Sequence, residues 1–492
     1  FAAVSTLGKG PAGFGLPMLV TFAYLCASRP GEELYARLQR IVRELTQFEI
    51  IAGLLIILAV SIPWYVAMYV RHGSPFTDRL IFHDMFNRAF HHVHDTNEGD
   101  DTSFRFYVWQ LGYALFPWTG LAPLGLLWWL RRGTSAEDND RADTSVLLAM
   151  WFLFAFALFS FMGTKFHHYI FPAVPPVAML VGVVLDDLLG RHEVAHGGDF
   201  ALTVVGMFGG VALMVLGVAR TQAGSFLGVK PDGKLADPSM GIGALLFVVG
   251  AALAVGSAWL VRAKDDDTPA EPEDGAKAHA SRMLGGAAVA GALVLVLVAR
   301  DLVIKPEGSD QPGAIRLLQL FTYNYRRAWP DSLDFSAALL GFGAIAILLS
   351  LCLAVRAIRK QAVVALCALA FFWGLWGVDV YMKKTAAHWG QHEVIEAYYA
   401  HRASPDEILV AYQMNWKGEN FYTGNHIPAF VSTGATFTNW LKKKREEGTK
   451  VMFFITEAGR VGGLKSEVGA KAYQEITDKT LCNKFTVIRA EL

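Results

Sequence analysis

The sequence predicts a mainly α-helical, polytopic membrane protein with a soluble α/β domain at its C-terminal end. Three observations support this fold class. Of the 492 residues, 53% are hydrophobic and only 18% are charged. About ten apolar runs approach the roughly 20 residues that a helix needs to cross a bilayer. From Lys384 onward, the composition changes to that of an ordinary soluble domain, with helical and extended segments in alternation.

Charge, cysteine content and the first residue narrow the class further. The formal net charge is zero, which argues against a nucleic-acid binder. The four cysteines are mostly in apolar runs, so no disulfide framework is indicated. The chain opens at Phe1 without a methionine, and no charged region precedes its first apolar segment. This segment therefore does not have the pattern of a signal peptide, and we expect further residues upstream.

The first 383 residues contain the predicted spans, and Lys and Arg are enriched in alternate loops between them. Because such loops face the cytoplasm, we expect the loops at 71–106, 163–167, 220–238 and 305–334 on the outer side, together with the 384–492 domain. The charged segment 262–281 lacks apolar periodicity and is predicted to be a mobile cytoplasmic loop. The predicted spans are Lys9–Cys26, Phe48–Val70, Tyr107–Leu130, Val146–Met162, His168–Leu189, Ala201–Ala219, Met240–Val261, Leu284–Ile304, Phe335–Val355 and Ala362–Met382.

The 384–492 domain is predicted to be a small α/β layer structure. Its glycines at 459, 462 and 463 do not have the spacing of a phosphate-binding fingerprint. The expected helices are His388–His401, Phe437–Glu447 and Leu464–Ile476, and the expected strands are Glu407–Ala411, Ala429–Ser432, Val451–Thr456 and Lys484–Arg489.

The stretch GTKFHHYIFPAVPP, at 163–176, carries most of the candidate chemistry. It places Lys165, His168 and Tyr169 between two apolar runs, at the predicted outer surface. Ionisable residues at the edge of a bilayer usually face a cavity or a pathway. Lys165 and Tyr169 would share one helical face if the second helix begins this early, with a first turn loosened by prolines.

The outer loop at 71–106 contains an amphipathic pattern. Phe82, Phe86 and Phe90 recur every four residues, and His83 and Arg88 lie on neighbouring stripes. This pattern predicts a helix in the membrane interface, with its apolar side toward lipid and its polar side toward either a cavity or solvent.

Two further features have a functional and a structural interpretation. The histidines at 91, 92 and 94 could bind a metal, but no HExxH or cysteine pattern accompanies them, which favours solvated side chains. Lys9, in GKGP, either extends to the headgroups or holds a phosphate together with Lys165 and Arg88.

With these motifs in view, the sequence resembles the membrane glycosyltransferases of family 39, which include protein O-mannosyltransferases and aminoarabinose transferases. The resemblance covers the first half of the chain well and the C-terminal domain loosely. The matching pieces are GKGPAGFGLP (8–17), PWY (63–65), the His83–Arg88 spacing, FPW (116–118), TKFHHYIFPAVPP (164–176) and ENFYTGNHIP (419–428).

The resemblance implies a GT-C-like helical bundle around a cavity, in the bacterial inner membrane, with its C-terminal domain in the periplasm. A polyprenyl-phosphate-linked sugar would bind there and pass, with inversion, to an extracytoplasmic acceptor. By motif position, Lys165, Tyr169, Arg88 and Lys9 would bind the donor phosphate, and His83 and His168 would line the cavity. In some family members the histidine corresponding to His83 helps to bind a divalent metal, which is the one cofactor that the resemblance suggests.

The chain departs from the family pattern in two places. The acidic residue expected as general base lies in a loop upstream of Phe1, so a chain lacking roughly five helices of about 20 residues each should be inactive alone. The carboxylate usually paired with the loop histidine is absent before His83, where Phe82 stands.

Two other classes of function remain open from the sequence. A lipid-linked sugar transporter also needs a polar cavity among many helices, although internal symmetry and midplane polar residues are not evident in this sequence. A non-catalytic envelope protein could bind its ligand through residues 384–492.

Overall fold

The structure is a computed structural model, and the chain divides into two compact units. Unit 1 comprises residues 1–309, 316–325 and 339–370, and unit 2 comprises residues 310–315, 326–338 and 371–492. The residues described are 1–10, 12–28, 33–47, 49–87, 105–127, 136–189, 209–210, 213–214, 217–218, 221, 239–265, 273–305, 311–321 and 329–492.

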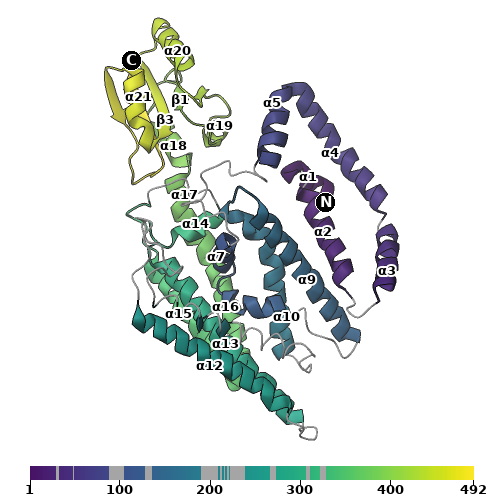
Figure 1. Ribbon diagram of the computed structural model, residues 1–492. Coiled ribbons are helices and arrows are strands. Elements are labelled where there is room, and N and C mark those ends of the chain that lie inside the picture. The colour runs from purple at the N-terminus through teal and green to yellow at the C-terminus, as the bar shows by residue number, and fades with distance from the viewer. Residues whose placement is uncertain are drawn as a thin grey trace. The chain divides into compact units, whose positions relative to one another are not determined.

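Apolar helices make up most of the described part of unit 1 (Figure 1). The helices of its first half are α1 (Ala2–Lys9), α2 (Ala12–Ala27), α3 (Leu34–Gln47), α4 (Ile50–His72), α5 (Ser74–Thr77), π-helix η1 (Asp78–Asn87), α7 (Arg105–Ala114), 3-10 helix η3 (Trp118–Leu121), α8 (Ala122–Leu127) and α9 (Ala136–Phe161). Those of its second half are 3-10 helix η5 (His167–Ala173), α10 (Val174–Leu189), α12 (Met240–Asp265), α13 (Glu273–Val303), α14 (Ile315–Phe321), α15 (Ser336–Cys352), 3-10 helix η6 (Arg356–Ile358) and α16 (Arg359–Trp376), several of which extend into unit 2.

Four helical segments in the described part of the chain are long and apolar enough to cross a membrane. They are Ile50–His72, Asp143–Phe161, His167–Asp186 and Arg359–Trp389. Three shorter apolar helices, Gly13–Ala27, Met240–Gly256 and Ser336–Cys352, also coincide with predicted spans. The mainly helical membrane architecture is therefore confirmed, whereas the count of about ten spans stays a prediction. Most of the predicted span at 201–219 lies outside the described residues.

The predicted single helix Tyr107–Leu130 is wrong. α7 ends at Ala114, and the chain continues through η3 and α8. The break falls at Pro117, whose nitrogen carries no hydrogen and cannot donate to a helical hydrogen bond. The tight η3 turn then approaches α13 closely, because a Cβ built on Gly120 would lie only 2.4 Å from the carbonyl oxygen of Gly291.

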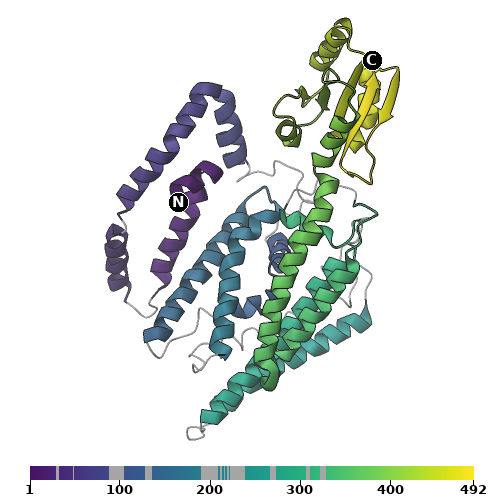
Figure 2. The same ribbon diagram turned by 180° about the vertical axis from the view of Figure 1, so that it is seen from behind.

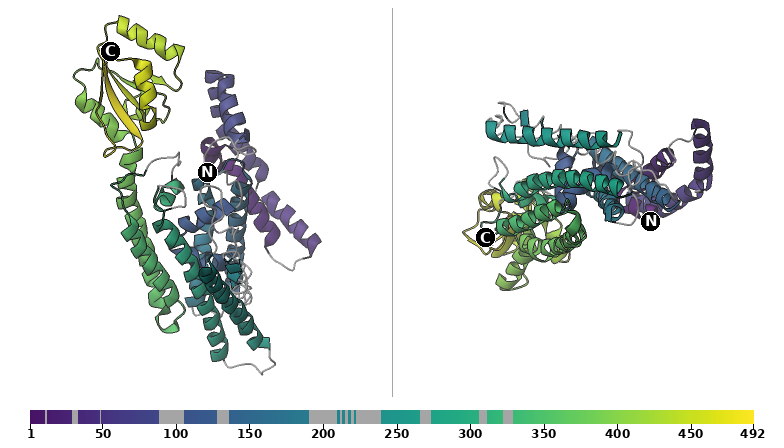
Figure 3. Two further views of the ribbon diagram at one scale, coloured as in Figure 1. Left: turned by 60° about the vertical axis from the view of Figure 1, so that its left-hand side comes forward. Right: turned by 90° about the horizontal axis from the view of Figure 1, so that it is seen from below.

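The segment 262–281 is more helical than the sequence pattern suggests. α12 continues to Asp265 and α13 begins at Glu273, so both edges of the predicted loop belong to helices. Alanine, glutamate and lysine are strong helix formers even where no apolar stripe is present, which explains the difference. α12 and α13 lie side by side (Figure 3).

Two features of unit 1 determine where candidate site residues lie. α9 and α10 pack side by side, joined by the segment that carries Lys165 (Figure 1). The chain also reverses direction between α4 and α5 at Gly73, whose φ of 67° favours glycine (Figure 2). The π-helix η1 follows this turn and carries His83.

Unit 2 contains the predicted α/β domain. Its helices are π-helix η7 (Gly377–Met382), α17 (Lys383–Trp389), α18 (His392–His401), α19 (Gly418–Tyr422), α20 (Ala435–Glu446), 3-10 helix η8 (Ala458–Arg460) and α21 (Val461–Val468). Its strands are β1 (Leu409–Tyr412), β2 (Ala429–Phe430), β3 (Val451–Glu457), β4 (Ala472–Glu475) and β5 (Phe485–Glu491), in the order β2-β1-β3-β5-β4. β1 is parallel to β2 and β3, whereas β5 is antiparallel to β3 and β4.

The sheet is covered on both faces, as the alternation along β3 shows. Phe453 and Ile455 pack with α18 in one core, while Met452 and Phe454 pack with α20 and α21 in the other. Because successive side chains of a strand point to opposite faces, one strand serves both cores.

Two predictions about this domain need correction. The helix predicted over Leu464–Ile476 ends at Val468, because Gly469 adopts a φ of 56° and closes it, and the following residues form β4. The helix predicted over His388–His401 is interrupted at Gly390 and Gln391, between α17 and α18.

Candidate functional site

The segment 163–176 links α9 to α10 without a regular α-helix at its start. α9 ends at Phe161, Phe166 is extended, and η5 occupies His167–Ala173 before α10 begins at Val174. Lys165 therefore lies outside the helix, and the prediction that it shares a helical face with Tyr169 is wrong. The prolines at 175 and 176 explain the late start, since proline is best tolerated in the first turn of a helix.

Lys165 is almost completely buried, with 1% of its surface exposed. Its ammonium donates hydrogen bonds to the carbonyl oxygens of Ser160, at 2.5 Å, and Met162, at 2.9 Å. These carbonyls belong to the C-terminal end of α9, where the helix dipole favours a cation. The lysine thus stabilises the end of one candidate span and fixes a positive charge beside the start of the next.

Tyr107 of α7 forms the wall beside this charge. Its ring centroid lies 5.6 Å from the Lys165 Nζ, within the range of a cation–π contact. Its hydroxyl donates a hydrogen bond to the carbonyl oxygen of Phe166 at 3.2 Å, and the residue has no exposed surface. One tyrosine therefore holds both the lysine and the extended segment that follows it.

The remaining polar residues of the segment lie among aromatic rings. The Tyr169 ring packs on Phe159 and Phe166, with centroids 5.5 and 5.0 Å away, and the His168 ring lies 5.0 Å from Tyr169. His167 packs on Phe106 at 4.9 Å. The structure thus brings together Lys165, His168 and Tyr169, three of the residues that the sequence selected.

The other selected residues are not assembled with these by the described contacts. His83 is half-buried on the π-helix η1. The predicted stripe assumed an α-helix, in which residues four apart share a face. A π-helical turn contains more residues than an α-helical one, so this four-residue spacing does not give the same alignment on η1. Lys9 ends α1, and Arg88 and the histidines at 91, 92 and 94 lie outside the described residues. Their place beside Lys165 stays a prediction.

Across the described ranges, no group of three His, Cys, Asp or Glu side chains is arranged to hold a metal. A divalent metal needs several oxygen or nitrogen ligands, so a metal site at His83 stays a prediction. We therefore route no chemistry through a metal at His83.

Sequence reasoning missed a second polar cluster, made of Tyr113, Asp301 and Arg316. The buried Tyr113 hydroxyl accepts a hydrogen bond from Arg316 and donates one to the Asp301 carboxylate at 3.2 Å. The Arg316 guanidinium lies 3.9 Å from that carboxylate and 5.3 Å from the Tyr113 ring centroid. The signal available in the sequence was Asp301, an acidic residue near the end of an apolar run.

α7 contributes to both clusters. Tyr107 contacts Lys165, Tyr113 contacts Asp301 and Arg316, and Gln110 between them is 7% exposed. The three-residue spacing of these polar side chains could have been read from the sequence as a buried polar stripe. Chemically, α7 places a buried lysine and two buried tyrosine hydroxyls beside a partly exposed, paired carboxylate.

No protein-family model matches the chain. An undecaprenyl phosphate-alpha-4-amino-4-deoxy-L-arabinose arabinosyl transferase of Pseudomonas aeruginosa is 30% identical over 216 residues, covering 43% of this chain and 33% of that protein. An uncharacterized protein of Aquifex aeolicus is 29% identical over 185 residues, covering 38% of this chain and 32% of that protein.

One solved structure, the crystal structure of ArnT from Cupriavidus metallidurans bound to undecaprenyl phosphate, matches with a TM-score of 0.40 and 15% identity, covering 99% of this chain and 67% of that one. The chain spans about a third of the length of the curated relatives that it matches. The resemblance to membrane glycosyltransferases of family 39, first indicated by short motifs, is therefore confirmed by relatives that carry an arabinosyl transferase name.

Proposed function

We propose that the protein transfers a sugar from a polyprenyl-phosphate donor to an extracytoplasmic acceptor at the bacterial inner membrane. The similarity over 216 residues to arabinosyl transferases that use an undecaprenyl phosphate donor supports this reaction and a pentose as the sugar. The observation that carries the proposal within this chain is the buried Lys165, held against Tyr107 between two candidate spans.

In the proposed reaction, the bond between the anomeric carbon and the donor phosphate oxygen breaks. A bond from the anomeric carbon to the acceptor oxygen forms on the opposite side of the sugar, and the acceptor proton passes to a general base. Negative charge develops on the departing phosphate. A preorganised cation in a water-poor site stabilises such charge more effectively than a solvated one. Lys165 supplies this cation, and Tyr169 donates a hydrogen bond to the same phosphate.

Lys165 must change partners to act in this way. With 1% of its surface exposed, it cannot meet a phosphate while its ammonium contacts Ser160 and Met162. Donor binding therefore exchanges at least one of these carbonyls for a phosphate oxygen. The extended residue Phe166 and the short η5 helix form the segment that moves, because a 3-10 helix is easier to rearrange than a regular α-helix.

The orientation of the site follows from charge. The alternate loops that do not contain Lys165 are the ones richer in Lys and Arg, which supports an extracytoplasmic position for Lys165 and for residues 384–492.

The test uses the full-length protein in membrane vesicles, supplied with an undecaprenyl-phosphate donor that carries a labelled aminoarabinose. The readout is label moved from the donor lipid into any other membrane component. Lys165→Met keeps the apolar stem but removes the charge, so transfer should fall by at least a hundredfold, equivalent to about 3 kcal/mol. Lys165→Arg should recover part of it.

The matched control is Lys383→Met. This variant removes an exposed lysine of α17, which forms an ion pair with Asp379 one turn earlier. It should leave transfer unchanged. Transfer by Lys165→Met at the native rate, in vesicles with equal amounts of folded protein, would contradict the site. Absence of transfer by the native protein with every lipid-linked sugar tested would contradict the function itself.

A further inference from the structure

α3 is an amphipathic helix whose apolar side is exposed. At about 100° of rotation per residue, its large apolar and aromatic side chains all fall within about 120° of the helix circumference. They are Leu34, Tyr35, Leu38, Ile41, Val42 and Leu45. All of them except Ile41 and Leu45 have between 52% and 72% of their surface exposed. The described segments of the chain therefore leave this apolar side largely uncovered.

The other exposed side of α3 is polar. Gln39 and Arg43 are both exposed, and Arg43 lies about 140° around the helix from Leu38. The third side packs against α2 and α4, and Arg40 and Ile41 are buried there. A helix that exposes one apolar and one polar side is suited to the boundary between an apolar phase and water.

Arg40 attaches α3 to the end of α2. One guanidinium nitrogen donates hydrogen bonds to the carbonyl oxygens of Leu25, at 3.0 Å, and Ser28, at 3.3 Å. α2 ends at Ala27, where the last carbonyls have no partner in the backbone ladder of the helix. Arg40 is 4% exposed, and its guanidinium lies 3.7 Å from the Glu44 carboxylate. These contacts hold α3 at the level where α2 ends.

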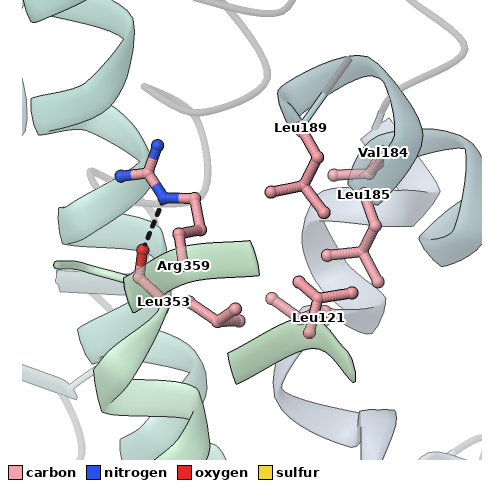
Figure 4. A pocket seen from close by; sticks show the side chains of 7 residues that line it. Leu121, Val184, Leu185, Leu189, Leu353 and Arg359 are labelled. Atoms are coloured by element: carbon pink, nitrogen blue, oxygen red, sulfur yellow. Dashed lines mark hydrogen bonds between the residues drawn. The ribbon is translucent and has the colours of Figure 1, made fainter. Parts of the chain in front are cut away.

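Arg359 makes the same type of contact at the end of another apolar helix. α15 ends at Cys352, and the Arg359 Nε donates a hydrogen bond to the carbonyl oxygen of Leu353 at 2.8 Å (Figure 4). In both places a buried arginine of the next helix satisfies a carbonyl where an apolar helix ends. Because α2 and α15 are apolar throughout, their ends mark an edge of the bilayer.

The helices on both sides of α3 are apolar. α3 follows α2 after a short link, and α4, a candidate span, begins at Ile50, soon after α3 ends at Gln47. The first turns of α4 also expose apolar side chains, with Ile51 77% and Leu55 60% exposed. Such side chains face lipid in a membrane span. The exposed apolar side of α3 thus stands next to lipid-facing surface along the chain.

We propose that α3 lies at the bilayer surface and binds the phospholipid layer, with Leu34, Leu38 and Val42 among the acyl chains and Arg43 toward water. Tyr35 fits this position, because a tyrosine ring favours lipid while its hydroxyl favours water. The contact is mainly apolar, so it does not require a particular headgroup. Since α3 joins α2 to α4, the contact fixes the depth of both helices in the membrane, independently of the proposed sugar transfer.

Two other occupants of the apolar side lead to a different result. A further protein segment or a second copy of the chain would also bury Leu38 and Val42, but against protein. Acyl chains of the bilayer would then not reach these two side chains, whereas they contact both of them if α3 lies in the bilayer surface.

The experiment uses the full-length protein in vesicles of phosphatidylethanolamine and phosphatidylglycerol, in a background from which all other cysteines have been removed. A polarity-sensitive fluorophore is attached to the cysteine introduced by Leu38→Cys, Val42→Cys or Arg43→Cys. Arg43→Cys is the matched control, because position 43 follows Val42 in the chain but lies on the polar side of α3. Only labelled proteins that keep the thermal midpoint of the parent protein are compared.

The labels at positions 38 and 42 should emit at a shorter wavelength than the label at position 43. Phospholipids with brominated acyl chains quench a fluorophore on contact. They should reduce the emission at positions 38 and 42 by about twofold or more relative to position 43. Short-wavelength emission at 38 and 42 without this quenching would indicate a protein contact and overturn the proposal. Equal emission wavelengths and equal quenching at the three positions would overturn it as well.

Discussion

The Lys165 ammonium lies 5.6 Å from the centroid of the Tyr107 ring, and the Tyr107 hydroxyl bonds to the carbonyl of Phe166, the residue after the lysine. A single side chain of α7 therefore holds both the charge and the backbone of the segment that connects α9 to η5. The stability of this segment and the position of its cation should respond together to changes at Tyr107.

Tyr107→Phe removes the hydrogen bond but keeps the ring. We expect it to lower the free energy of unfolding by about 1 kcal/mol. Tyr107→Leu also removes the cation–π contact, which should lower the free energy of unfolding by a further ~0.5–2 kcal/mol. Thermal unfolding in detergent should thus rank native above Tyr107→Phe and Tyr107→Phe above Tyr107→Leu. Identical midpoints for the two variants would show that the ring contact contributes nothing.

The cluster of Tyr113, Asp301 and Arg316 should matter more than an exposed ion pair. Asp301→Asn leaves a partly buried guanidinium without its carboxylate, so we expect a loss of about 1–3 kcal/mol. The matched control is Asp379→Asn, whose ion pair with Lys383 joins side chains that are 68% and 72% exposed. It should cost less than about 1 kcal/mol. Equal shifts of the thermal midpoint for both variants would contradict this ranking.

Two phenylalanines of the C-terminal domain give a paired test of its core. Phe437 is fully buried beneath the sheet, whereas Phe421 is 78% exposed. Phe437→Ala should cost about 3–5 kcal/mol through lost burial and a cavity. Phe421→Ala should change stability by no more than about 0.5 kcal/mol. Limited proteolysis of the complete chain should cut this domain faster only in Phe437→Ala, and faster cleavage of Phe421→Ala would place Phe421 in a packed contact.

Stability of the same domain should fall at alkaline pH because of Cys482. Burial raises the pKa of the Cys482 thiol above its usual range. A group whose pKa is raised by folding contributes stability below its unfolded pKa, about 8.5 for cysteine, and loses it as the pH rises toward the folded value. The difference in thermal midpoint between the native protein and Cys482→Ala should therefore shrink from pH 7.5 to pH 10. A constant difference across this range would show that the thiol does not titrate with unfolding.

The fold class was predictable because apolar run length and strand alternation are local properties of the sequence. The positions of α4, α15 and β3 agree with the predicted segments within a few residues. Interruptions were harder to predict, because an apolar composition does not reveal where the backbone turns. The break at Pro117 and the helix end at Gly469 each depend on one residue within a run that otherwise favours a helix.

The candidate site was predictable only in part, for a related reason. Lys165, His168 and Tyr169 stand together in the sequence, so their proximity needs no tertiary information. Tyr107 reaches Lys165 across 58 positions, and Arg316 reaches Tyr113 across 203, so these contacts depend on how α7, α13 and α14 pack. Polar residues inside apolar runs were the available signal, but a sequence does not state which pairs meet.

The 3-10 geometry of η5 also affects how the chain matches the thickness of the bilayer. A 3-10 helix rises about 2.0 Å per residue and an α-helix about 1.5 Å. With seven of its 20 residues in η5, the span His167–Asp186 reaches about 33 Å instead of about 30 Å. The hydrocarbon layer is about 30 Å thick, so a span of this length would extend beyond it and would place His167 at the headgroups. The same residues wound as a regular α-helix would only just cross that layer, leaving the Lys165 end at the edge of the lipid tails.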